Sequence, residues 1–160
     1  MFFLLIFPFL QIHTDPALKQ LPKEAIQVVD EHLTVNWKLL GNHIYKCNLN
    51  GDSLSDYALA ATVGKGNSRV EYYFALIAHK DGYAFHLLTT MPAELVRAGG
   101  VKFILRHKGE KATDFPTSAM GEPKQIILPT DAIEFVPNVG CCSTIQIFRD
   151  GFFQMITSGD

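Results

Sequence analysis

The spacing of apolar residues follows a helical period most clearly in residues 22–33. Ile26, Val29 and Leu33 recur at positions that share one face of an α-helix, and polar residues lie on the other faces. Pro22 is well suited to the first turn of a helix, because that turn does not need its missing N–H. The pattern therefore predicts one helix from Pro22 to Leu33.

Residues 37–40 are predicted to begin an extended segment that Gly41-Asn42 closes. After it the period of the apolar residues changes to two, which is typical of strands. Asp81-Gly82 and Asp150-Gly151 lie between apolar runs and predict tight hairpins, because Asp-Gly supplies the positive φ angles that such turns need. Residues 108–123 are polar and rich in Gly and Pro, and predict a long surface loop. The expected strands cover residues 37–40, 55–63, 69–79, 83–88, 101–107, 125–128, 132–136, 143–148 and 152–156, with a short helical segment in 91–97.

Strands that follow one another through tight turns favour antiparallel pairing. We therefore expect an α+β fold: a mostly antiparallel sheet, or a small half-open barrel, with one N-terminal helix packed on it. Residues 15–160 are expected to form a single domain. Neither helical crossovers nor a glycine-rich phosphate loop are evident, so a dinucleotide-binding fold is not predicted.

The first ten residues, MFFLLIFPFL, are apolar apart from Pro8. This run is too short to span a bilayer, which takes about 20 apolar residues. Residues 1–14 are interpreted either as an export signal or as an N-terminal arm, although no basic residue precedes the run and no small-x-small cleavage motif follows it. Export predicts a periplasmic or extracellular protein with no membrane span in the mature chain; the alternative is the cytoplasm.

Hydrophobic content and charge balance limit the classes of function that this chain could have. The chain has 160 residues, 48% of them hydrophobic, which is enough for a substantial core. Its 14 Lys and Arg against 16 Asp and Glu leave no basic excess to neutralise phosphates, so a nucleic-acid partner is not expected.

Three cysteines, Cys47, Cys141 and Cys142, cannot all pair within one chain. A disulfide between Cys47 and either Cys142 or Cys141 would close a long loop and stabilise the fold by about 4 kcal/mol. A bond within the vicinal pair and three reduced thiols remain the alternatives. Adjacent cysteines do not have the spacing of a structural zinc site.

The segment 48–56 is the most informative stretch chemically. Oxygen-bearing side chains stand at alternate positions, and the backbone carbonyl of Leu54 adds another oxygen, as in loops that bind hard cations such as calcium. The predicted metal ligands are Asn48, Asn50, Asp52, Leu54 and Asp56. The loop is not an EF-hand, because Ser53 and Leu59 replace its required Gly and Glu. A weak calcium site and a hydrogen-bonded Asx turn between two strands are both compatible with this pattern.

This loop resembles the Asp-x-Asn-Gly-Asp-Gly-x-x-Asp loops of FG-GAP and VCBS-type extracellular repeats, which run directly into a strand, as Asp56-Tyr57-Ala58-Leu59 does here. Asn48 and Ser53 depart from that pattern, where the repeats have Asp and Gly. With Trp37 before the loop and Thr157-Ser158-Gly159-Asp160 at the end, the chain also resembles a group of small uncharacterised bacterial exported proteins. The resemblance implies no catalytic residue.

No complete catalytic signature is present. Cys141 or Cys142 with His79, His86 or His107 would provide a nucleophile and a base, but the residues around the cysteines match no thiol hydrolase pattern. Asp131 and Glu134 have no partner visible in the sequence.

These observations favour a non-enzymatic exported domain that binds a protein or a cell-envelope component, a class that includes inhibitors and immunity factors. A small cysteine-dependent hydrolase and a calcium-stabilised structural module are the alternatives.

Overall fold

The computed structural model describes residues 15–33, 36–115, 122–140 and 142–158. Two α-helices, two short 3-10 helices and ten strands are assigned within them. In chain order they are η1 (Pro16–Gln20), α1 (Lys23–His32), β1 (Lys38–Cys47), β2 (Asp56–Val63), η2 (Gly66–Ser68), β3 (Val70–His79), β4 (Gly82–Pro92), α2 (Ala93–Arg97), β5 (Val101–Arg106), β6 (Lys111–Asp114), β7 (Lys124–Ile127), β8 (Ala132–Pro137), β9 (Ser143–Arg149) and β10 (Phe152–Ser158).

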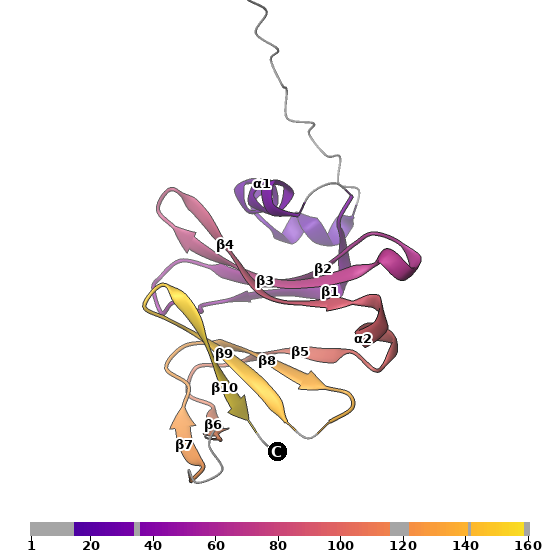
Figure 1. Cartoon of the computed structure of the whole chain (residues 1–160). Coiled ribbons are helices and arrows are strands. Elements are labelled where there is room, and N and C mark those ends of the chain that lie inside the picture. The colour runs from indigo at the N-terminus through magenta and orange to yellow at the C-terminus, as the bar shows by residue number, and fades with distance from the viewer. Residues whose placement is uncertain (1–14, 34–35, 116–121, 141, 159–160) are drawn as a thin grey trace, which may run out of the picture.

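The strands form two stacked antiparallel sheets and one small hairpin. Sheet A has the order β1-β2-β3-β4, sheet B has the order β10-β9-β8-β5, and β6 pairs with β7. Figure 1 shows sheet A above sheet B, with α2 joining them at one end. The Tyr45 hydroxyl of β1 donates to the Phe103 carbonyl of β5 at 3.0 Å, and the Gln146 amide of β9 donates to the Leu88 carbonyl of β4 at 3.2 Å. The β1 edge of sheet A therefore lies next to β5, and the β4 edge lies next to the β9–β10 side of sheet B.

Helix α1 covers the outer face of sheet A, as Figure 1 shows. Its residues Ala25 and Val29 are fully buried and share one core cluster with alternate residues of the sheet, among them Leu59 and Phe74. The predicted helix is confirmed to within one residue at each end, with Pro22 and Leu33 as its caps.

A second cluster fills the space between the two sheets. Ala58, Ala60 and Ala75 face this side of sheet A, where Ile133 and Phe135 of sheet B meet them. Strands β2 and β3 are thus buried on both faces, which explains their nearly continuous apolar sequences. The small alanines allow the two sheets to approach closely.

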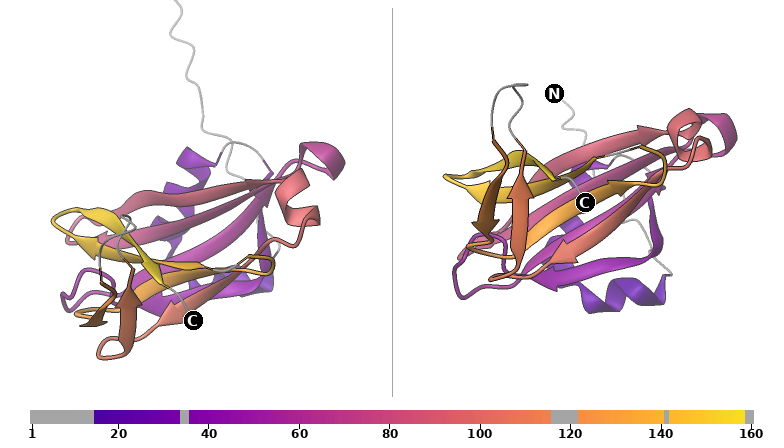
Figure 2. Two further views of the ribbon diagram at one scale, coloured as in Figure 1. Left: turned by 60° about the horizontal axis from the view of Figure 1, so that its bottom comes forward. Right: turned by 90° about the horizontal axis from the view of Figure 1, so that it is seen from below.

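The β6–β7 hairpin stands against the far face of sheet B, as Figure 2 shows. Ala112 and Leu128 pack there on Ala132, Ile145 and Ile147. The expectation of one long loop over residues 108–123 is therefore wrong for residues 111–114, which form β6. The strand is stabilised by packing of Ala112 against sheet B, and the polar local sequence gives no sign of this contact.

The two Asp-Gly turns differ in conformation. Asp150 and Gly151 both have positive φ, 52° and 88°, and connect Arg149 to Phe152 as predicted. At the other hairpin His79 pairs with Gly82, so Lys80 and Asp81 form the turn and only Gly82 has positive φ. Both hairpins exist, but the positive-φ pair predicted at Asp81-Gly82 is wrong.

The expectation of a mostly antiparallel fold that also contains helix is confirmed. The strands are divided between separate sheets and close into no barrel within the described ranges. No helix in this part of the chain is long and apolar enough to cross a membrane. The predicted leader, residues 1–14, lies outside the described residues.

Candidate functional site

The predicted cation loop folds onto its own backbone. The Asn48 side-chain oxygen accepts a hydrogen bond from the Gly51 amide at 2.8 Å, and the Asn50 oxygen accepts from the Asp52 amide at 3.0 Å. Asp52 in turn accepts from the Leu54 amide at 2.6 Å. Side-chain oxygens spaced two residues apart thus bind backbone N–H groups, which is the geometry of consecutive Asx turns.

Asp56 closes this loop from inside the protein. Its side chain is fully buried, and one carboxylate oxygen accepts from the Leu49 and Asn50 amides at 2.7 and 3.2 Å. The other oxygen accepts from the Ala78 amide of β3 at 2.8 Å. Burial raises the pKa of Asp56, and these amide donors partly offset that rise. Asp56 therefore links the loop to the end of β3. Because β2 and β3 are antiparallel, this is also the end at which the loop leads into β2 at Tyr57.

Asp131, the residue before β8, connects this loop to sheet B. Its carboxylate accepts from the Asn48 amide at 2.9 Å and from the Lys108 amide at 3.0 Å, and the His107 ring lies 3.7 Å away. The Asp131 amide donates back to the Asn48 carbonyl at 3.1 Å. The sequence showed no partner for Asp131, because its partners lie 23 and 83 positions away.

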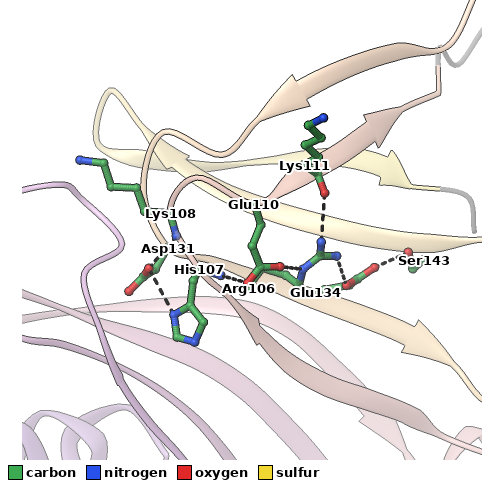
Figure 3. A network of polar contacts seen from close by, with 8 residues as sticks. All are labelled: Arg106, His107, Lys108, Glu110, Lys111, Asp131, Glu134 and Ser143. Carbon is green, nitrogen blue, oxygen red and sulfur yellow. Dashed lines mark hydrogen bonds and ion pairs between the residues drawn. The ribbon is translucent and has the colours of Figure 1, made fainter.

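Arg106 organises a second polar network at the end of β5, drawn in Figure 3. Its guanidinium donates to Glu110 at 2.5 Å, to the buried Glu134 at 2.7 Å and to the Lys111 carbonyl at 3.1 Å. Glu134 also accepts from the buried Ser143 hydroxyl at 2.6 Å. The network ties β5, β6, β8 and β9 together where the β6–β7 hairpin leaves the sheet.

This network does not have the geometry of nucleophilic catalysis. An activated serine needs a base that is itself oriented by a third group. The Ser143 hydroxyl instead contacts Glu134 and the Ser158 carbonyl, and the His107 ring is directed at Asp131. These contacts indicate a role in holding the strands together.

The first of the two predicted disulfides, between Cys47 and Cys142, is not formed. The Cys47 thiol is buried and donates to the Tyr45 carbonyl at 3.6 Å. Cys47 adjoins Asn48, which meets Asp131 before β8, whereas Cys142 adjoins β9 at the other end of the β8–β9 pair. Six strand residues separate these ends, about 20 Å, and a disulfide needs Cα atoms within about 7 Å.

Cys141 lies outside the described residues, so a bond between it and Cys47 stays a prediction. Burial raises the pKa of the Cys47 thiol, and the nearby Asp56 and Asp131 carboxylates raise it further. A reactive thiolate needs the opposite environment, so Cys47 does not fit a catalytic role.

The histidines named as bases lie in separate places. His86 contacts the rings of Phe148 and Phe153 between the sheets, at centroid distances of 5.2 and 5.8 Å. Burial there lowers the pKa of His86, and His79 on the neighbouring strand lowers it further. The His107 ring contacts Asp131, which lies at the end of sheet B opposite to Cys142.

The proposed calcium ligands lie together in the loop, and whether they bind the ion stays a prediction. Within the described ranges, no group of three or more His, Cys, Asp or Glu side chains is arranged to hold a metal. The likeness to FG-GAP and VCBS loops also stays a prediction. A scan against family models and searches of curated proteins and of solved structures found no match to this chain.

Proposed function

We propose that this protein is a non-enzymatic binding domain that holds an extended, uncharged segment of a partner protein along the edge strand β10. The observation that carries the proposal is a difference in charge between the two open sides of the stacked sheets. An inhibitor or an immunity factor belongs to this class. Export, which the N-terminal sequence favours, would place the partner in the cell envelope or outside the cell.

One side of the stack, formed by β1 and β5, is charged. β1 carries Lys38 and Lys46 and has an irregular register between Leu39 and Ile44, and β5 carries Lys102 and Arg106. Charged side chains and irregularities of this kind are the devices by which proteins keep edge strands from pairing with other chains.

The other side, formed by β4 and β10, has no Asp, Glu, Lys or Arg in either strand. These strands expose large apolar side chains instead: Leu87 is 53% exposed, Phe152 54% and Met155 66%. Met155 lies on the face of β10 toward sheet A, whereas Leu87 and Phe152 lie on the outer faces of their sheets. Interfaces that bind proteins are depleted of charge at their centres and enriched in aromatic residues and Met. This side therefore has the composition of a binding surface.

The backbone of β10 adds a specific mode of binding. Phe152 closes a two-residue hairpin with Arg149, so residues 152, 154, 156 and 158 direct their N–H and C=O groups to β9. Phe153, Met155 and Thr157 direct theirs away from β9. The Phe115 amide donates to the Thr157 carbonyl at 2.9 Å, which confirms this direction.

Phe115 thus already pairs with Thr157 at this edge, and Met155 and Phe153 hold the next two outward positions, with which no strand among the described residues pairs on the side away from β9. The β9–β10 register is regular, and β10 contains neither Pro nor a charged residue. An extended partner segment adding here would gain backbone hydrogen bonds and cover Met155. Like this edge, such a segment would be uncharged and apolar.

The test is capture of a partner from cell-envelope extract with three baits: the unchanged protein, Met155→Lys and Ile127→Lys. Ile127 on β7 is 67% exposed and provides a matched control away from β10. We expect one stoichiometric partner with the unchanged protein and with Ile127→Lys, and none with Met155→Lys. Hydrogen exchange of the Phe153 and Met155 amides should slow in the complex. Equal capture by all three baits, or no capture by the unchanged protein, would overturn the proposal.

A further inference from the structure

A cavity of about 560 Å³ lies at the end of sheet A where β1 begins and β2 ends, apart from β10. Its lining residues are Asn36, Lys38, Thr62, Val63, Gly64 and Lys65. Lys38 and Thr62 are cross-strand partners, so their side chains leave the same face of the sheet. Two ammonium-bearing side chains therefore come to one cavity from two different segments, and none of its described lining residues carries a carboxylate.

Neither Lys38 nor Lys65 forms an ion pair with a carboxylate of the described residues. Glu71 lies opposite Thr62 in the strand register, but both of its oxygens are engaged. One accepts from Arg69 and the other from the Tyr73 hydroxyl, each at 2.7 Å.

The backbone on the Lys65 side of the cavity is fixed. Gly64 has φ of 85°, and a Cβ there would lie 2.4 Å from the Ser68 carbonyl oxygen, so only glycine fits this turn. The Lys65 carbonyl accepts from both the Ser68 hydroxyl and the Ser68 amide, at 2.8 and 3.1 Å. Arg97 of α2 donates to Asn67 at 2.8 Å and holds the same turn from outside.

The backbone on the other side is also anchored. Asn36 has φ of 67°, a conformation that asparagine adopts more readily than most residues. Trp37 follows it, is 2% exposed and donates from its ring nitrogen to Asp30 of α1 at 2.7 Å. Lys38 is therefore attached to a buried anchor, and the spacing between the two lysine Cα atoms is set by the fold.

We propose that this cavity binds a small multivalent anion, a molecule carrying phosphate or carboxylate groups whose negative charge the two lysines share. The Asn36 amide supplies a neutral hydrogen-bond donor beside them and Val63 an apolar contact. The Thr62 hydroxyl donates to the Lys38 carbonyl at 3.5 Å. This site is independent of strand addition at β10 and is tested without a partner protein.

The experiment follows backbone amide signals of Asn36, Gly64 and Lys65 by NMR while sodium citrate or sodium phosphate is added at constant ionic strength. The additions extend to about 20 mM, above the millimolar dissociation constant expected of a few solvent-exposed contacts. We expect saturable shifts, larger affinity for citrate than for phosphate, and no shift with glycerol as a neutral probe.

Lys38→Gln and Lys65→Gln should each weaken citrate binding about fivefold, and the double variant should abolish saturation, because each removes a charge-assisted contact. The control is the double variant Lys80→Gln, Lys102→Gln, which removes the same charge from exposed positions elsewhere and should keep the dissociation constant within about twofold. Shifts that stay linear for both anions, or an equal loss in the control, would overturn the proposal.

Discussion

Asp56 and Glu134 are both buried carboxylates, yet the protein satisfies them in different ways. Asp56 accepts three backbone N–H groups and has no basic side chain among its hydrogen-bond partners. Glu134 accepts from two side chains, the Arg106 guanidinium and the Ser143 hydroxyl. The first arrangement fixes the path of the backbone, and the second fixes the packing of strands that are already formed.

This difference predicts which hydrogen bonds would be lost on removal of each carboxylate. Removing the Asp56 carboxylate leaves three backbone donors without their acceptor. Removing the Glu134 carboxylate leaves Arg106 with Glu110 and the Lys111 carbonyl still bound. The loop is therefore expected to be less tolerant of substitution than the network.

The largest effect is expected for Asp56→Ala. Three amides, two of them in buried hydrogen bonds, would lose their acceptor, and each unsatisfied buried group costs about 1–3 kcal/mol, so the free energy of unfolding should fall by about 4 kcal/mol. Urea denaturation measures this loss. Asp56→Asn, which keeps one acceptor oxygen, should fall between Asp56→Ala and the unchanged protein and still fold.

Asp52→Ala is the matched control in the same loop, because Asp52 is exposed and its carboxylate accepts from Leu54 and Asn50 at the surface. It should cost about 1 kcal/mol. Equal losses for Asp52→Ala and Asp56→Ala would contradict the view that the buried carboxylate determines the loop.

Glu134→Gln should lower the free energy of unfolding by about 2 kcal/mol, because a glutamine amide keeps the volume but loses the charge that pairs with Arg106. A double-mutant cycle with Arg106→Met separates the pair from the rest of the network, and we expect a coupling of about 1–2 kcal/mol. A coupling near zero would show that Glu134 is held by Ser143 and packing alone.

The sequence predicts the local hydrogen bonds of the loop but not the long-range contacts of the two carboxylates. Alternating Asn and Asp residues predict the Asx turns of residues 48–54, because each oxygen binds an amide two or three positions away. Asp56 stands at the end of this pattern in the sequence, but its contact with the Ala78 amide depends on the β2–β3 register. Local spacing carries no information about that partner.

The same limit applies to the division into two sheets. Alternation predicts strands and turns, but sheet membership depends on which faces pack, and the alanine-rich runs of β2 and β3 fit one sheet or two equally well. The β4–β10 side could only be recognised once the strand order showed which strands lie at the edges. Cysteine count alone allows Cys47 to pair with Cys142 or Cys141, whereas the fold places Cys47 and Cys142 at opposite ends of the β8–β9 pair.

Acid should weaken the network through Glu110. The Arg106 guanidinium and the His107 amide lower the pKa of Glu110, so the folded protein binds this proton less tightly than the unfolded chain does. The resulting stability is fully present above the unfolded value, about pH 4.3, and is lost as the pH falls through the lower folded value.

Comparing the unchanged protein with Glu110→Gln between about pH 7 and pH 3 isolates this contribution. The difference in the free energy of unfolding should be below about 1 kcal/mol near neutral pH, because the pair is partly exposed, and should shrink toward zero in acid. A difference that stays constant with pH would mean that Glu110 acts through packing rather than charge.

The smallest effect is expected for calcium, and it bears directly on the loop. The Asn48, Asn50 and Asp52 oxygens already accept backbone N–H groups, so binding a cation would require breaking the turns that shape the loop. We expect the Tm in about 10 mM calcium to match that in about 10 mM magnesium within about 1 °C. A millimolar calcium site would instead stabilise by about 1.4 kcal/mol, or about 4 °C for a chain of this size. A rise that is specific to calcium and abolished by Asp52→Asn would show that these oxygens hold a cation. The loop would then be shaped by a metal ion and not by hydrogen bonds from its own backbone.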